Sequence, residues 1–132
     1  MLRAAVLMGM VLAAPPTLAS EVSIASVASA SGRFQVEVRA REVPLKRGPQ
    51  TLRIVVTEAQ THAPATGLQL SVEPWMPAMG HGINDTPQVS AAGPGQFQVV
   101  DLDLFMPGVW ELRLRLSGAA TDQAVVTLKL TR

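Results

Sequence analysis

The most chemically distinctive part of the sequence is the run from residue 75 to residue 82, which carries two methionines and a histidine. Met76, Met79 and His81 follow the spacing M-x-x-M-x-H and supply two thioether sulfurs and one imidazole. These neutral, polarizable donors suit Cu(I) better than Zn(II), Ca(II) or Mg(II), and a thioether binds without losing a proton. The sequence therefore predicts a Cu(I) site in this run. The alternative is that both methionines only pack as flexible apolar side chains.

Neighbouring residues would shape this loop. Pro77 restricts the backbone between the two methionines, while Gly80 and Gly82 permit the φ values that a tight loop around the histidine needs. Trp75 would either shield a bound cation with its ring or contact a partner protein. Copper, as Cu(I), is thus the one cofactor that these residues predict.

The first 19 residues have the three regions of a secretory signal peptide. Arg3 supplies the charged region, an apolar run follows over residues 4–14, and small residues before Ala19 predict cleavage after it. The apolar run is shorter than the roughly 20 residues that span a bilayer, so a retained anchor is the weaker alternative. We expect export to the periplasm without a membrane anchor after cleavage, and full secretion is the alternative.

The remaining chain, residues 20–132, has the length of one domain. Of the 11 Lys and Arg residues and the 10 Asp and Glu residues, only Arg3 lies in the signal peptide, so this domain is formally neutral. It therefore lacks the concentrated positive charge that nucleic acids and anionic membranes attract. Because the chain has no cysteine, the domain depends on hydrophobic burial instead of disulfides and has no lipid-attachment cysteine.

Apolar and polar residues alternate with a period of two, which is typical of half-buried strands, and no window shows a helical repeat. The clearest alternating runs cover residues 34–40, 52–57, 68–73 and 124–130, with Gly- and Pro-containing turns between runs. This pattern predicts an all-β fold, an immunoglobulin-like β-sandwich of about seven antiparallel strands. We place the sandwich domain at residues 33–132, and residues 20–32 before it form a flexible lead-in or a weak edge strand.

A hairpin is predicted around Pro107 and Gly108. A three-residue loop, residues 107–109, keeps the inward-facing parity of both flanking strands by pairing Met106 with Trp110. The same register would place Asp103 opposite Arg113 and Asp101 opposite Arg115 on the outer face, as salt-bridged pairs.

A β-bulge is predicted near Val100. Phe97 and Val99 have the opposite parity to Leu102 and Leu104, although all four are apolar. One extra residue in the strand would turn all four toward the core.

Strand direction predicts which loops meet. If successive strands alternate in direction, the Pro107 turn and the loop of Trp75 to His81 lie at the same end of the sandwich. Met106 is therefore a conditional fourth metal donor, and its inclusion depends on its side chain facing the loop. His62, the only other histidine, falls at the opposite end and is rejected as a ligand.

Sequence signatures of catalysis are lacking. The chain has no cysteine nucleophile, G-x-S-x-G elbow, glycine-rich phosphate loop or histidine-rich zinc motif. An enzyme is therefore not expected.

Two motifs carry a family resemblance. The run 74–82 holds Met76, Met79 and His81, and the later run 105–112 holds Met106 and Trp110 on either side of Gly108. Together they resemble the YtkA-like and FixH-like domain families, which carry an M-P-x-M-x-H loop and a later M-x-G-x-W hairpin on an immunoglobulin-like sandwich. The resemblance extends over roughly residues 34–130. The chain departs from these families in having neither a lipobox cysteine nor a longer membrane anchor.

The resemblance implies an exported accessory domain, and FixH-like members are associated with copper supply and cytochrome oxidase assembly. The leading hypothesis is a periplasmic Cu(I) carrier or buffer whose partner is a copper-handling or oxidase-assembly membrane protein. The alternative is a non-metal envelope interaction module that contacts a partner protein through the same apolar loop.

Overall fold

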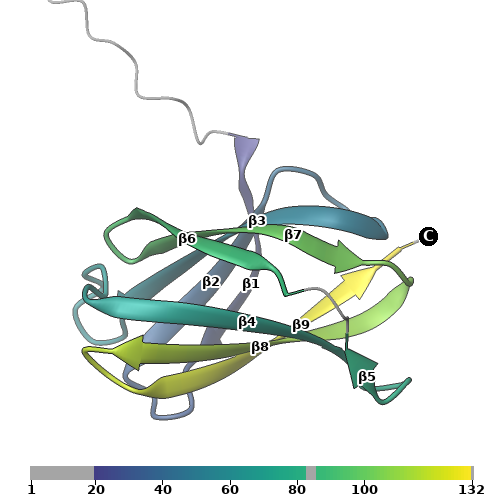
Figure 1. Cartoon of the computed structure of the whole chain (residues 1–132). Helices are drawn as coiled ribbons and strands as arrows, with labels where there is room; N and C mark the ends of the chain where they lie inside the picture. Colours follow the sequence, from purple (N-terminus) through teal and green to yellow (C-terminus); the bar gives the residue numbers. More distant parts are fainter. Residues whose placement is uncertain (1–19, 83–85, 132) are drawn as a thin grey trace, which may run out of the picture.

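The computed structural model describes residues 20–82 and 86–131, and these residues form two antiparallel β-sheets packed face to face (Figure 1). One sheet has the strand order β1-β2-β3-β7-β6, and the other has the order β5-β4-β8-β9. The strands are β1 (Val22–Ala28), β2 (Phe34–Ala40), β3 (Gly48–Glu58), β4 (Leu68–Met76), β5 (His81–Gly82), β6 (Gln88–Gly93), β7 (Gln96–Leu104), β8 (Gly108–Gly118) and β9 (Asp122–Leu130). The predicted β-sandwich is confirmed. The described residues contain nine strands instead of about seven, because β1 pairs along β2 at the sheet edge and the two-residue β5 adds a short second edge.

Alternation explains the core. Every second residue of the central strands faces the opposite sheet and is buried, while its neighbours face outward. Trp110, at the start of β8, is fully buried and is the largest side chain of the core. The buried inward-facing residues include Phe34, Val36, Val38, Leu52, Ile54, Val56, Leu112, Leu114, Leu116, Val126 and Leu128. The domain thus rests on apolar burial between two sheets, as expected for a chain without disulfides.

The predicted bulge is present in β7. Leu52 lies opposite Val99 and Gln50 lies opposite Leu102, so two residues of β7 face one residue of β3. Asp101 adopts a left-handed φ of 57° at this position. As a result, β7 buries apolar residues on both sides of the bulge.

The predicted hairpin register is wrong. β7 pairs with β3 and β6, whereas β8 pairs with β4 and β9, so the chain crosses from one sheet to the other after Leu104. The residues expected opposite one another across a ladder, such as Asp103 and Arg113, therefore lie in different sheets. The same alternate residues face the core whether β7 and β8 form a hairpin or lie in different sheets. The sequence pattern therefore did not distinguish between the two arrangements.

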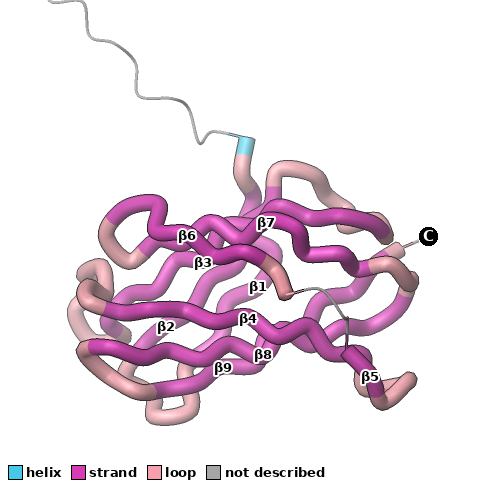
Figure 2. Tube along the Cα trace, in the orientation of Figure 1, coloured by secondary structure: helices cyan, strands magenta, loops and turns pink. Residues whose placement is uncertain are grey.

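The predicted placement of loops at the two ends is confirmed. Antiparallel pairing of Trp75 with Glu111 puts the end of β4 beside the start of β8. This is the right-hand end in Figure 1, and Figure 2 shows that the connections between strands gather at both ends. The His62 amide donates to the Glu58 carbonyl after the far end of β3, so this histidine belongs to the opposite end.

A carboxylate joins the two sheets at that opposite end. The Oδ1 atom of Asp122 accepts one hydrogen bond from the backbone N–H of Ser31, at 3.2 Å, and one from the backbone N–H of Gln123, at 2.9 Å. The Oδ2 atom accepts one from the Ser31 hydroxyl. Burial acts to raise the pKa of Asp122, but hydrogen bonds from Ser31, Ser29 and Gln123 outweigh it and lower this pKa to about 2. The turn between β1 and β2 is thereby tied to the start of β9.

Replacing Asp122 by asparagine is expected to reduce the free energy of unfolding at pH 7 by about 1 kcal/mol, because the charge-assisted hydrogen bonds weaken. The folded pKa lies below the ordinary value of 3.8, so the contribution of Asp122 is complete above pH 3.8 and is lost as the pH falls toward 2. Urea unfolding across this range should therefore show less acid destabilisation for Asp122→Asn than for the wild type. Asp101→Asn, at an exposed carboxylate, is the control, and equal acid slopes for all three proteins would contradict the prediction.

Among the described residues, no helix is long and apolar enough to cross a membrane. The signal-peptide prediction concerns residues 1–19, which lie outside the described residues.

Candidate functional site

The methionine-histidine loop is a tight turn between β4 and β5. The Met76 carbonyl accepts hydrogen bonds from the amides of Met79 and Gly80, at 3.1 and 3.0 Å. Gly80 has a φ of 65°, which a residue with a Cβ adopts at a steric cost. This turn makes Met76 and His81 direct partners across the antiparallel pair. Partners of this kind project from the same face with Cβ atoms roughly 5 Å apart, so the thioether and the imidazole start from neighbouring positions.

The imidazole of His81 is oriented by its own backbone neighbour. Its Nδ1 lies 3.0 Å from the Gly82 carbonyl oxygen. A carbonyl oxygen only accepts, so Nδ1 carries the proton and donates it, and the lone pair of the neutral ring is on Nε2. Histidine ligands in metal sites are commonly held in this way, with one ring N–H bonded to a carbonyl and the other nitrogen on the metal.

Met76 is the buried one of the two candidate methionine donors of the loop. Its side chain is only 3% exposed and belongs to the hydrophobic core. Its terminal methyl reaches the start of β8, where a Cβ on Gly108 would lie 3.3 Å from Met76 Cε. Gly108 has no side chain and thus leaves room for the thioether at the interface of the two sheets.

Met79 is the exposed one of these two candidate donors. Its side chain is 53% exposed, on the turn that follows β4. The loop therefore presents one sulfur toward the core and one toward solvent, with His81 half-buried between the two extremes.

Met106 lies on the connection between β7 and β8, at the same end as the loop. Its side chain is half-buried against the core, and its carbonyl oxygen accepts a 2.9 Å hydrogen bond from Nε1 of Trp110. The structure therefore brings the Met106 backbone to the correct end of the fold. Its role as a metal ligand stays a prediction.

Phe105 is a residue of this site that the sequence reasoning missed. Its ring stacks on the His81 imidazole, with a centroid distance of 6.1 Å and an interplanar angle of 8°. The same ring meets Trp110 edge to face, at 5.6 Å and 76°. Phe105 has the outward parity of β7 and is 42% exposed, so an exposed aromatic beside Met106 was the available signal.

Trp75 lies on the other face of β4 from Met76, because adjacent strand residues alternate. The Arg113 guanidinium lies over its ring, with Cζ 4.5 Å from the centroid. Arg113 thus stacks on a tryptophan within its own sheet instead of pairing with Asp103. The Trp75 ring thus lies on the face of β4 away from the Met76 side chain, and its role stays a prediction.

Comparison with known proteins identifies the family. The YtkA-like family profile matches residues 28–115, which is most of the described sandwich. The chain belongs to the YtkA-like family. The family predicted from the two motifs is therefore confirmed, and the YtkA-like match includes the methionine-histidine loop, Phe105 and Met106.

The YtkA-like domain also resembles a solved structure, a copper-bound variant of FetP from uropathogenic Escherichia coli. The two chains are 8% identical, superpose with a TM-score of 0.58, and align over 84% of this chain and 97% of the FetP chain. At this identity the likeness establishes a shared fold. A search of curated proteins finds no match.

Oxygen, thiolate and imidazole donors do not cluster in the part of this YtkA-like domain that the structure describes: no three His, Cys, Asp or Glu side chains lie close enough to hold one ion. The candidate site differs from such clusters in drawing on thioether sulfur. Its donor set is chemically suited to Cu(I), which prefers soft ligands.

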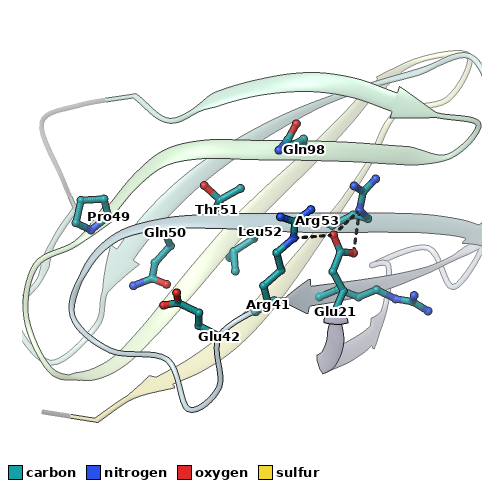
Figure 3. A pocket seen from close by; sticks show the side chains of 11 residues that line it. Glu21, Arg41, Glu42, Pro49, Gln50, Thr51, Leu52, Arg53 and Gln98 are labelled. Atoms are coloured by element: carbon teal, nitrogen blue, oxygen red, sulfur yellow. Dashed lines mark hydrogen bonds and ion pairs between the residues drawn. The ribbon is translucent and has the colours of Figure 1, made fainter. Parts of the chain in front are cut away.

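A separate cavity of about 310 Å³ lies on the outer face of the five-stranded sheet (Figure 3). Both carboxylate oxygens of Glu21 accept from Nε of Arg53, at 2.9 and 3.1 Å, and Arg53 also donates to Gln96. The Glu21 side chain is 6% exposed, and Arg41 approaches it at 3.9 Å. These charges pair with one another and anchor the residue before β1 to β3, so we read this cavity as structural.

Proposed function

We propose that this protein is an exported Cu(I)-binding accessory protein, a carrier or buffer, that acts in the periplasm. Met76, Met79 and His81 are its ligands, and Met106 is the conditional fourth. The observation that carries the proposal is the cross-strand pair of Met76 and His81, with the imidazole Nδ1 engaged by the Gly82 carbonyl. A thioether and an Nε2 lone pair then start from adjacent positions and can share one ion.

The donor set also fits the compartment and the fold. Thioethers need no deprotonation and do not form disulfides, so they suit an oxidising environment. A copper-bound protein of the same fold supports copper as the ion. The proposal includes no catalytic step, and the protein would pass Cu(I) to a copper-handling or oxidase-assembly membrane protein.

His81→Ala is expected to weaken Cu(I) binding at least tenfold, because it removes the only nitrogen donor of the loop. The measurement is anaerobic competition between the purified domain and a chromophoric Cu(I) chelator. His62→Ala is the matched control, since His62 is exposed at the opposite end of the sandwich, and it should bind as the wild type does. Equal affinities for wild type and both variants would overturn the proposal.

A second candidate is an interaction module without metal. Met79, Phe105 and Val109 are exposed at the loop end by 53%, 42% and 44%. Apolar side chains gathered at one end favour contact with an apolar partner surface. Capture of a membrane or envelope protein that persists in excess Cu(I) chelator, and that Met79→Ser abolishes, would support this candidate over the copper carrier.

A further inference from the structure

A chain of contacts links the histidine of the loop to the connection between β7 and β8. His81 stacks on Phe105, and Phe105 meets Trp110 edge to face. Trp110 is fully buried and donates its indole N–H to the Met106 carbonyl at 2.9 Å. The half-buried His81 is thus connected through the exposed Phe105 ring to the buried Trp110.

We propose that Phe105 is the positioning residue for His81, a role that rests on the proposed function of the loop. The hydrogen bond from Nδ1 to the Gly82 carbonyl selects which nitrogen is left to bind metal. That single bond still allows the ring plane to tilt. The parallel Phe105 ring fixes the plane, and the two restraints together hold Nε2 in one direction.

Phe105 suits this role because it is not itself a core residue. It is 42% exposed and follows the last residue of β7, where an ordinary solvent-facing position would accept a polar side chain. Its two described ring contacts are with His81 and with Trp110. The contact with the buried Trp110 holds the Phe105 ring in place. Through its contact with His81, the Phe105 ring in turn limits the movement of the imidazole.

Preorganisation of this kind raises affinity without adding a ligand. A ring that is free to tilt must be ordered when the ion binds, whereas a stacked ring is ordered beforehand. Aromatic pairs of this geometry have measurable interaction energies, which set an upper limit of about two- to tenfold on the change in affinity when the pair is lost. Phe105 therefore changes the affinity for Cu(I), while the donor residues determine whether Cu(I) binds at all.

The test compares Phe105→Leu, which keeps an apolar side chain without a ring, with Phe105→Tyr, which keeps the ring. Val109→Leu is the matched control, because Val109 is equally exposed at the same end and has no described contact with His81. The first measurement is the NMR signal of the His81 ring protons in metal-free protein. The second is Cu(I) affinity by chelator competition.

Phe105→Leu should shift the His81 ring signals and weaken Cu(I) binding, by no more than about two- to tenfold, while Phe105→Tyr and Val109→Leu keep both near wild type. In a His81→Ala background, Phe105→Leu should have no further effect on affinity, since the role acts through His81. Unchanged His81 signals in metal-free Phe105→Leu, or an equal loss of affinity with and without His81, would overturn this inference. Absence of Cu(I) binding by the wild type would refute the copper carrier instead, and the metal-free signals would still test the stack.

Discussion

Replacing Met76 and Met79 together by leucine is expected to lower Cu(I) affinity by about 100-fold or more. Leucine preserves apolar volume but has no sulfur, so the soft donors are removed while the shape of the loop is kept. Loss of a group that only supports a metal ligand already costs about 10- to 100-fold, and loss of the ligands themselves should cost at least as much. Anaerobic chelator competition measures the affinity of both proteins.

Stability separates this loss of donors from a loss of fold. Met76 is buried and Met79 is exposed, and exchange of methionine for leucine in a core usually costs less than about 1.5 kcal/mol. Urea unfolding of the metal-free double variant should therefore stay within that range of the wild type. Met106→Leu alone tests the conditional fourth donor, and wild-type affinity for this variant would remove Met106 from the site. Retention of full Cu(I) affinity by the variant that lacks Met76 and Met79 would refute the copper carrier.

Trp110→Ala is expected to destabilise the domain by about 3 to 5 kcal/mol, the largest effect of any substitution considered. The indole is fully buried between the sheets, and its removal leaves a cavity and an unpaired Met106 carbonyl. Urea unfolding followed by far-UV circular dichroism measures the loss independently of tryptophan fluorescence.

Trp75→Ala is the matched control for Trp110→Ala. Trp75 is half-buried on the outer face of β4, where its described ring contact is Arg113, so its loss should cost about 1 kcal/mol. Trp110→Phe should fall between the two, since it keeps most of the apolar volume but removes the hydrogen bond to Met106. Equal destabilisation by Trp75→Ala and Trp110→Ala would contradict this account of the core.

The sequence supported accurate predictions where side-chain parity alone decided the outcome. Alternation identified the residues that face the core, and the parity change between Val99 and Leu102 located the bulge in β7. Alternating strand direction placed the methionine-histidine loop and Pro107 at one end and His62 at the other. These arguments need only the face of the sheet toward which each side chain points and the direction in which each strand runs.

The alternation of inward- and outward-facing residues does not specify which strands pair with one another. The crossover after Leu104 satisfies the same inward pattern as a hairpin, so the expected pairing of Asp103 with Arg113 was wrong. The contact of Phe105 with His81 arises at that crossover, since Phe105 directly follows β7 and stacks on the first residue of β5. The donors of the loop stay a prediction from the sequence, which missed the aromatic residue that stacks on the histidine.

The crossover after β7 also determines what a bound ion would do to the whole domain. The connection of residues 105–107 joins β7 of one layer to β8 of the other, and the loop of Met76 and His81 belongs to the four-stranded layer. An ion held by the loop would be linked to that connection through the contact of His81 with Phe105. Because such an ion binds the folded state and not the separated strands, its binding free energy would add to the work of unfolding. The free energy of unfolding of this domain would then increase with the fraction of the protein that has bound copper.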